Sequence, residues 1–321
     1  MKALVFDEFG SKDVLYSKEV ADPVLKPDVI LLRMKAIGLN FADIYRRNGN
    51  YHLEGNPPFI LGYEGAGIVE KVGEKVIGIK VGDRIAFADV PYANAELVAV
   101  PSEKSIPIPN ELSYEQAASL LLQGLTAQYL AADSYSIKPG DTVLVHSAAG
   151  GVGQLLIQIA KLKGAEVIAI TSTDEKAQAA KKAGADTVLF YKNNWVEQVK
   201  EATDGMGADV AYDAVGSTLN QSFASVKTGG SVVFYGMAGG EPPLIDPRML
   251  MDTSKTLTGG DLWNVLQTKE DRLERSKQLF DWVKQGQLRI QAPTIFPLSK
   301  GADAHELLES RKSMGKILLI P

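Results

Sequence analysis

The sequence predicts a mixed α/β chain in which a doubly wound parallel sheet is joined to a second, β-rich domain. Strand and helix patterns alternate between residues 142 and 235, as in parallel sheets that helices cover on both faces. Before residue 110 the chain instead shows short β-rich runs punctuated by Gly and Pro. In segment 141–161 a glycine-rich turn follows a buried strand pattern and opens an amphipathic helix.

The size and composition are those of a soluble globular enzyme. A chain of 321 residues can form two domains with separate cores. The net charge of −5, without a Lys/Arg block, argues against nucleic-acid and anionic-membrane partners. The absence of cysteine excludes disulfides, thiol catalysis and cysteine-ligated zinc. Because no apolar run suits a signal peptide or a membrane span, we expect a cytoplasmic protein.

The first domain is expected to span residues 1–112 and to consist of short strands. The β-rich runs cover residues 2–6, 29–37, 66–72, 84–88 and 95–100. Ser113 and Gln116 then have the spacing of a capping box before an apolar run, which predicts a helix start at this point.

The second domain is expected to span residues 113–265. Its strands are predicted over 142–146, 166–171, 186–190, 208–212 and 230–235, and its helices over 152–163, 174–183, 194–202 and 218–226. The remaining residues, 266–321, carry a charged helix near 269–285, a helix near 300–311 and a strand over 316–320. We expect them to return to the first domain, because the alternating sheet is already complete.

The last strand of the alternating region has a second interpretation. Its apolar residues 232–235 could form an exposed sheet edge, and such an edge favours pairing with a second subunit. We therefore expect a homodimer joined near strand 230–235.

The glycine-rich turn has the spacing of a dinucleotide-binding loop. In the template G-x-G-x-x-G, Ala148, Gly150 and Gly153 take the fixed positions. Glycine lets the backbone approach a pyrophosphate, which binds at the N-terminus of a helix. An ordinary α/β turn would look similar, but the strand pattern that follows the helix favours the dinucleotide site. The residues expected at the pyrophosphate are Ala149, Gly150, Gly151, Val152 and Gly153.

Several segments, in this order, resemble the zinc-independent quinone oxidoreductases of the medium-chain dehydrogenase/reductase superfamily. They are 38–43 (GLNFAD), 62–67 (GYEGAG), 81–84 (VGDR), 124–127 (GLTA), 148–153 (AAGGVG) and 304–311 (AHELLESR). The resemblance implies a GroES-like catalytic domain that the C-terminus completes, and an inserted Rossmann domain. It also implies NADPH bound in a cleft between the two, and a homodimer or tetramer.

The residues that would hold a catalytic zinc are replaced. Zinc-dependent relatives use a Cys or Asp, a Gly-His-Glu segment and a later Cys. Here Asn40 stands in the first region and Tyr63 replaces the histidine, while Glu64 remains. Since a catalytic zinc needs three closely placed ligands, we expect no metal site and a structural or hydrogen-bonding role for Glu64.

The end of the second Rossmann strand favours NADPH over NADH. NAD-specific sites carry a carboxylate there, whereas this strand ends in the Thr-Ser-Thr segment 171–173. The resemblance implies that Lys176 and Tyr191 meet the 2′-phosphate, and the hydroxyl of Ser172 suits the same group. Two alternatives stay open: segment 172–175 also has the pattern of a helix cap, and Asp174 lies close enough to act as an NAD-type acid.

The nicotinamide and substrate end is assigned to Asn40, Tyr45, Tyr51 and Thr126. The first three are expected in the loop after the strand that ends near residue 37, and they are the catalytic candidates. Tyrosines offer a planar ring a flat apolar face with a polar tip, although most tyrosines are packing residues and Thr126 could be an ordinary helix hydroxyl. The residues that follow the last Rossmann strand are further cofactor candidates: Tyr235, Gly236 and Met237.

These features predict an NADPH-dependent oxidoreductase that transfers hydride to a quinone or a similar conjugated carbonyl compound. One alternative is a reductase of the carbon–carbon double bond in enones or enoyl thioesters. That reaction also needs a proton at the α-carbon, for which Tyr51 or Tyr45 is the candidate donor. An alternative of another class is a non-enzymatic NADPH-binding structural protein or redox sensor.

Overall fold

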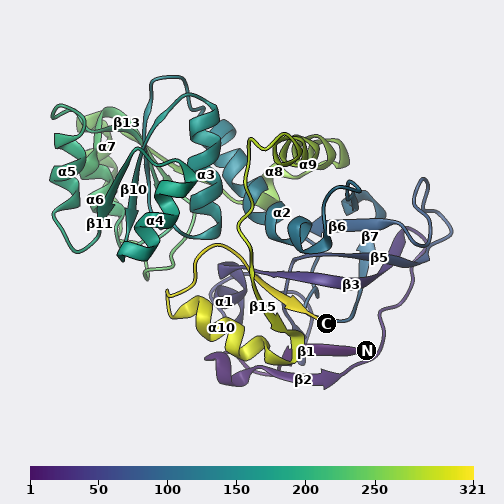
Figure 1. Cartoon of the computed structure of the whole chain (residues 1–321). Coiled ribbons are helices and arrows are strands. Elements are labelled where there is room, and N and C mark those ends of the chain that lie inside the picture. Colours follow the sequence, from purple (N-terminus) through teal and green to yellow (C-terminus); the bar gives the residue numbers. More distant parts are fainter. The chain divides into compact units, whose positions relative to one another are not determined.

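The computed structural model describes all 321 residues, which form two compact units. The first unit comprises Met1–Leu122, Leu266–Lys284 and Ile290–Pro321. The second comprises Gln123–Val265 and Gln285–Arg289. The chain leaves the first unit within helix α2 (Tyr114–Tyr129) and returns to it at Leu266 (Figure 1).

The first unit contains two sheets. The smaller has the strand order β2-β1-β4, and the larger has the order β15-β16-β3-β5-β6-β8 with β7 also paired to β3. All neighbouring strands are antiparallel except β15 and β16, which are parallel. The strands are β1 (Lys2–Phe6), β2 (Tyr16–Glu19), β3 (Val29–Leu39), β4 (Phe59–Ile60), β5 (Glu64–Val72), β6 (Arg84–Ala88), β7 (Leu97–Pro101), β8 (Ile106–Pro107), β15 (Thr294–Pro297) and β16 (Ile317–Ile320).

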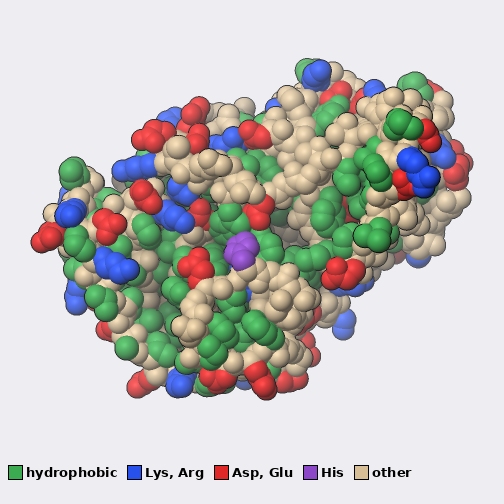
Figure 2. Space-filling view, turned by 180° about the vertical axis from the view of Figure 1, so that it is seen from behind, with side chains coloured by type: hydrophobic (Ala, Val, Ile, Leu, Met, Phe, Trp, Pro, Cys, Tyr) green, Lys and Arg blue, Asp and Glu red, His purple; other side chains and the backbone are tan.

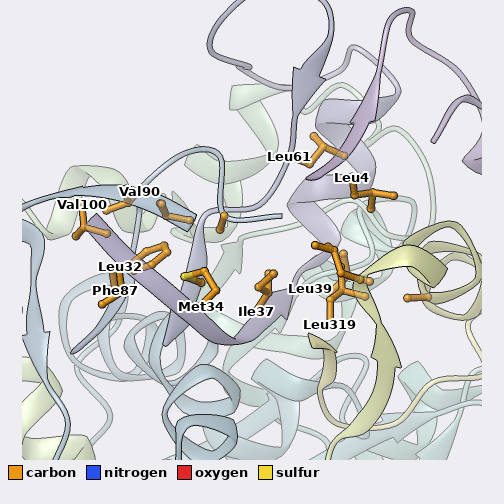
Figure 3. Close-up of a cluster of buried hydrophobic side chains, with 14 of the residues drawn as sticks. Leu4, Leu32, Met34, Ile37, Leu39, Leu61, Phe87, Val90, Val100 and Leu319 are labelled. Atoms are coloured by element: carbon orange, nitrogen blue, oxygen red, sulfur yellow. The ribbon is translucent and has the colours of Figure 1, made fainter. Parts of the chain in front are cut away.

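Strand β3 holds the first unit together. It pairs with β5, β7 and β16, and nine of its eleven residues are buried. Figure 3 shows apolar side chains of β1, β3, β6 and β16 gathered in one core, among them Leu4, Ile37, Phe87 and Leu319. The helices of this unit are α1 (Phe41–Arg47), the first half of α2, α9 (Lys269–Lys284) and α10 (Gly301–Glu309).

The second unit is a six-stranded parallel sheet with the order β11-β10-β9-β12-β13-β14. Helix α3 lies beside α4 and helix α5 beside α6, and Figure 1 shows helices on both faces of the sheet. No helix of the chain combines the length and the apolar composition that a membrane span requires. The strands are β9 (Thr142–Val145), β10 (Glu166–Thr171), β11 (Thr187–Phe190), β12 (Ala208–Asp213), β13 (Val226–Phe234) and β14 (Thr256–Gly259). The helices are α3 (Gly151–Leu162), α4 (Asp174–Ala183), α5 (Trp195–Glu201), α6 (Leu219–Ser225), α7 (Pro247–Thr253) and α8 (Leu262–Val265).

The sequence placed most of these elements within two residues of their bounds. Strand β10 and helix α4 have the predicted bounds, and the capping box at α2 is present. There Ser113 N–H donates to Gln116 Oε1 (2.8 Å) and Gln116 N–H donates to Ser113 Oγ (3.1 Å).

Two expectations were wrong. The run 230–235 is not an edge strand, because β13 lies between β12 and β14, and β14 forms the edge. Its apolar character reflects burial inside the sheet. In addition, Tyr45 does not lie in a loop, because α1 begins directly after Asn40. Asn40 N–H donates to Asp43 Oδ2 (2.9 Å), so the Asn-x-x-Asp spacing was a capping signal in the sequence.

A buried arginine connects α1 to α10. Arg47 is fully buried, and its Nη2 lies 2.6 Å from Glu309 Oε1. Its Nη1 lies 3.1 Å from Nδ1 of His305, which is also fully buried. Since the guanidinium can only donate, Nδ1 accepts and His305 carries its proton on Nε2. Burial and the neighbouring Arg47 cation lower the pKa of His305 to about 3.

This lowered pKa predicts an acid-sensitive contribution to stability. The unfolded chain protonates His305 near the ordinary pKa of 6.5, so the unfolded state gains protons first as the pH falls and unfolding becomes easier. The contribution is complete above 6.5 and decreases by about 1.4 kcal/mol per pH unit below it. Urea unfolding from about pH 7.5 to about pH 5 should therefore show a smaller loss for His305→Gln than for the wild type. Parallel losses would contradict the assignment.

Candidate functional site

The glycine-rich loop connects strand β9 to helix α3. Ser147 turns the chain with a φ of +48°, and Gly150 precedes the first residue of the helix. No side chain caps the N-terminus of α3, and its first turn carries no acidic residue. The N–H groups of that turn therefore suit an anionic group.

Close packing explains the glycines of this loop. A Cβ on Gly153 would lie 2.6 Å from the Ser147 carbonyl oxygen, and a Cβ on Gly151 would collide with the Gln123 side chain. Gln154 Nε2 donates to the Ala149 carbonyl oxygen (2.7 Å) and holds the loop against the helix. Together with the uncapped helix, this geometry fits a dinucleotide pyrophosphate at Ala149–Gly153.

A chain of buried polar groups supports the loop. Tyr191 OH accepts from Ser147 N–H (2.9 Å) and lies 3.2 Å from His146 Nδ1. His146 Nε2 lies 3.0 Å from Ser222 Oγ, which donates to Asp213 Oδ2 (2.6 Å). Burial lowers the pKa of His146, so the neutral ring accepts from Tyr191 and donates to Ser222. These contacts connect the carboxyl ends of β9, β11 and β12.

Asp213 is the final acceptor in this series of hydrogen bonds. Its Oδ1 accepts from Val215 N–H (2.8 Å) and Gly216 N–H (3.0 Å), and its Oδ2 accepts from Thr218 Oγ1 (2.8 Å). Burial opposes ionisation, but the hydrogen bonds from Ser222 and from the N–H groups of Gly216 and Val215 lower the pKa of Asp213. The carboxylate therefore shapes the loop that follows β12.

The loop after β13 is hydrogen-bonded to the loop after β12. Ala238 N–H donates to the Ala214 carbonyl oxygen (3.1 Å), and Gly239 N–H donates to that of Val215 (2.8 Å). Between these contacts and β13 lie the three cofactor candidates of this loop. They are Tyr235, Gly236 and Met237.

No carboxylate ends strand β10. Thr171 is buried, Ser172 is exposed, and Thr173 caps helix α4 by accepting from Lys176 N–H (3.3 Å). The cap expected within segment 172–175 is therefore present and centred on Thr173. Asp174 is the first residue of α4 and is exposed, so the strand end itself presents hydroxyls, with the Lys176 side chain one turn on.

In the first unit, Asn40 belongs to a buried ionic cluster. Glu64 is fully buried and accepts from Asn40 Nδ2 (2.9 Å) and from Leu122 N–H (2.7 Å). Lys316 Nζ lies 2.5 Å from Glu64 Oε2 and 2.9 Å from Asn40 Oδ1. Glu64 thus has the hydrogen-bonding role that we expected, whereas sequence reasoning missed Lys316.

Arg46 organises the aromatic residues around α1. Its guanidinium carbon lies 3.7 Å from the ring centroid of Tyr63 and 4.9 Å from that of Tyr51. Its Nη1 lies 3.5 Å from Asp43 Oδ1, and Nε donates to the His52 carbonyl oxygen (3.1 Å). Burial raises the pKa of Asp43 despite this cation. The guanidinium and the two rings hold the segment that carries Tyr51.

The predicted residues fall into two groups. Asn40, Tyr45 and Tyr51 belong to the first unit, and Tyr45 packs on Phe41 with ring centroids 5.4 Å apart. Thr126 belongs to the second unit, with the glycine-rich loop and all the other cofactor candidates. No group of three or more His, Cys, Asp or Glu residues could hold a metal ion.

Comparison with known proteins relates both units to oxidoreductases. Residues 26–139 match the alcohol dehydrogenase GroES-like domain, and residues 151–278 match a family described as zinc-binding dehydrogenase. The chain is 37% identical to a quinone oxidoreductase of Pseudomonas aeruginosa, over 100% of this chain and 99% of that protein. It is also 37% identical to a 2-haloacrylate reductase of a Burkholderia species, over 99% and 98% of the two chains.

The fold matches as completely as the sequence. The crystal structure of Escherichia coli quinone oxidoreductase complexed with NADPH superposes with a TM-score of 0.97 at 37% identity, covering 100% of both chains. The similarity carried by a few sequence motifs therefore extends over the whole chain.

Proposed function

Because this chain belongs to the quinone oxidoreductases of the medium-chain dehydrogenase/reductase superfamily, we propose that it reduces quinones or similar conjugated carbonyl compounds with NADPH. The observation that carries the proposal is the open, glycine-lined N-terminus of α3 in a chain that matches an NADPH complex over its full length. When bound, NADPH supplies the hydride.

The second unit is proposed to bind the cofactor. The loop Ala149–Gly153 receives the pyrophosphate, and Ser172 and Lys176 receive the 2′-phosphate, with the ring of Tyr191 beside it. Tyr191 already supports the loop through Ser147 N–H, which ties the two phosphate sites together. Thr126 and the segment 235–237 are proposed to contact the nicotinamide half.

The first unit is proposed to bind the acceptor through Asn40, Tyr45 and Tyr51. A reduced quinone is a stabilised aromatic oxyanion that can take its proton from water. The residues therefore need to orient a planar ring, for which Tyr45 and Tyr51 offer flat faces, and no side chain has to transfer a proton.

The reaction is proposed to proceed without zinc. Asn40 and Tyr63 occupy positions where zinc-dependent relatives carry metal ligands. Their side chains here contact the cations of Lys316 and Arg46. Both contacts suit amide and aromatic groups that face a positive side chain rather than a metal ion.

A small molecule is the proposed partner, rather than nucleic acid or a membrane. Figure 2 shows Lys/Arg and Asp/Glu side chains interspersed on the visible face, without a large patch of one sign. The cytoplasmic location inferred from the sequence stays a prediction.

The same fold supports a second candidate, the reduction of activated carbon–carbon double bonds. The similarity to a 2-haloacrylate reductase favours it. This reaction differs from quinone reduction because its carbanion-like intermediate needs a proton, so a placed acid would contribute roughly 10²–10⁴-fold.

NADPH oxidation with a panel of quinones, enones and haloacrylates tests the function and separates these candidates. Quinones should be the better acceptors, and a metal chelator should leave turnover intact. Tyr51→Phe should keep quinone kcat within about twofold, while Tyr51→Ala should raise KM about tenfold through loss of the ring contact. Preference for enones, with kcat lowered more than about a hundredfold in Tyr51→Phe, would replace the quinone assignment by alkene reduction.

Lys176 should set the preference for NADPH. A charge-assisted hydrogen bond to the 2′-phosphate contributes about 1.5–3 kcal/mol, which corresponds to a tenfold or larger effect on affinity. Lys176→Ala should weaken NADPH binding, measured by fluorescence titration, and leave NADH binding nearly unchanged. Lys181→Ala, a later lysine of the same helix, is the control. Equal losses for NADPH and NADH would assign Lys176 to helix stability.

We also propose a homodimer, now through β14 rather than β13. Edge strand β14 carries Leu257, which is 37% exposed, and Met251 nearby on α7 is 73% exposed. Sedimentation velocity at micromolar concentration should give twice the monomer mass. Leu257→Lys should shift the protein to monomer, because a charged edge resists strand pairing, whereas Val81→Lys in the first unit should not. A monomeric wild type would refute the dimer.

A further inference from the structure

The amide of Asn40 is held in one orientation by two buried ions. Lys316 Nζ lies 2.9 Å from Asn40 Oδ1, and Asn40 Nδ2 donates to Glu64 Oε2 (2.9 Å). An ammonium can only donate and a carboxylate can only accept. A flipped amide would place N–H against ammonium and oxygen against carboxylate. The ion pair, 2.5 Å from Nζ to Oε2, therefore defines which way Asn40 points.

The surroundings leave this cluster no alternative arrangement. The Lys316 side chain is 3% exposed and that of Glu64 is 0% exposed, so water cannot replace either ion. The second oxygen of Glu64 is bound by Leu122 N–H at 2.7 Å. A Cβ on Gly38 would collide with the Glu64 carboxylate. The cluster thus joins the residue before α1, the start of β5, helix α2 and the residue before β16.

We propose that Lys316 is a positioning residue for the reaction, which acts by fixing the amide of Asn40 against Glu64. This inference rests on the proposed function, in which Asn40 contacts the reacting groups. Lys316 is buried, and its ammonium group contacts Asn40 and Glu64, so it is expected to act through Asn40. Its loss should slow the hydride-transfer step and leave NADPH affinity, which depends on the second unit, unchanged.

The informative variant removes both charges together. Removing one ion of a buried pair leaves the other uncompensated, whereas neutral replacement of both is tolerated far better. Glu64→Gln/Lys316→Met keeps both side-chain volumes similar. It leaves the direction of the Asn40 amide unrestricted, because the introduced amide both donates and accepts and the introduced thioether donates no hydrogen bond. The double variant should therefore fold and lose only the fixed direction of Asn40.

The first unit offers a matched control. Arg272 Nη2 lies 2.8 Å from Asp89 Oδ2, with side chains 3% and 5% exposed, and the pair has no role in the proposed site. Asp89→Asn/Arg272→Met removes this buried ion pair. Lys104, which also contacts Asp89, is 30% exposed and can be solvated by water. It should lower thermal stability and leave kcat and the isotope effect at wild-type values.

The test compares wild type, double variant and control in three measurements: NADPH affinity by fluorescence titration, kcat with a quinone, and the primary isotope effect with NADPH deuterated at C4. The double variant should bind NADPH within about twofold of wild type and lose about 10- to 100-fold in kcat, the usual cost of a small misplacement. Its isotope effect should rise, because hydride transfer becomes rate-limiting.

If the double variant has the same kcat and the same isotope effect as the wild type, the inference is overturned. The cluster would then have a purely structural role. If the double variant shows no cooperative unfolding, Glu64→Gln/Lys316→Gln is measured by the same criteria, because it also removes both charges and both introduced amides can still bond to Asn40 and to Leu122 N–H. If the wild type fails to oxidise NADPH with every acceptor of the panel, the proposed function is overturned, and this inference with it.

Discussion

A buried carboxylate must receive hydrogen bonds from the chain, because no water can solvate it. Two such groups, one in each unit, lie beside the candidate functional residues. In the first unit, Glu64 accepts hydrogen bonds from Asn40, Leu122 N–H and Lys316. In the second unit, Asp213 accepts hydrogen bonds from two side-chain hydroxyls and two backbone N–H groups. The loops that carry the candidate functional residues take their shape from these two requirements.

The two clusters serve different parts of the proposed chemistry. Asp213 acts at a distance, through Ser222, His146 and Tyr191, on the turn that opens the glycine-rich loop. The groups between Asp213 and the glycine-rich loop are neutral, and each link is a directed hydrogen bond, which makes the turn rigid. Glu64 instead works with an ammonium ion. Positive side chains lie against its neighbours: Lys316 contacts Asn40, and Arg46 contacts Tyr63.

Local patterns predicted the parts of the site that depend on sequence neighbours. The glycine spacing, the strand before it and the amphipathic helix after it are close in the chain, so the strand, the glycine-rich turn and the helix could be read directly. A signal for α1 was also present, in the Asn-x-x-Asp spacing that begins at Asn40. An acid at the end of an apolar strand, as at Asp213, is a comparable signal for a buried acceptor.

The sequence by itself determined the fold class, the order of the elements and most of their bounds, because the periodicity of apolar residues, glycines and caps acts over a few residues. The tertiary structure alone decided which strand forms the edge, because strand order depends on which separated segments pair, and β13 lies between β12 and β14. It also decided the partner of Glu64. Lys316 lies 252 residues away in sequence, and only the pairing of β16 with β3 brings the residue before β16 to the end of β3, where Asn40 and Glu64 meet it.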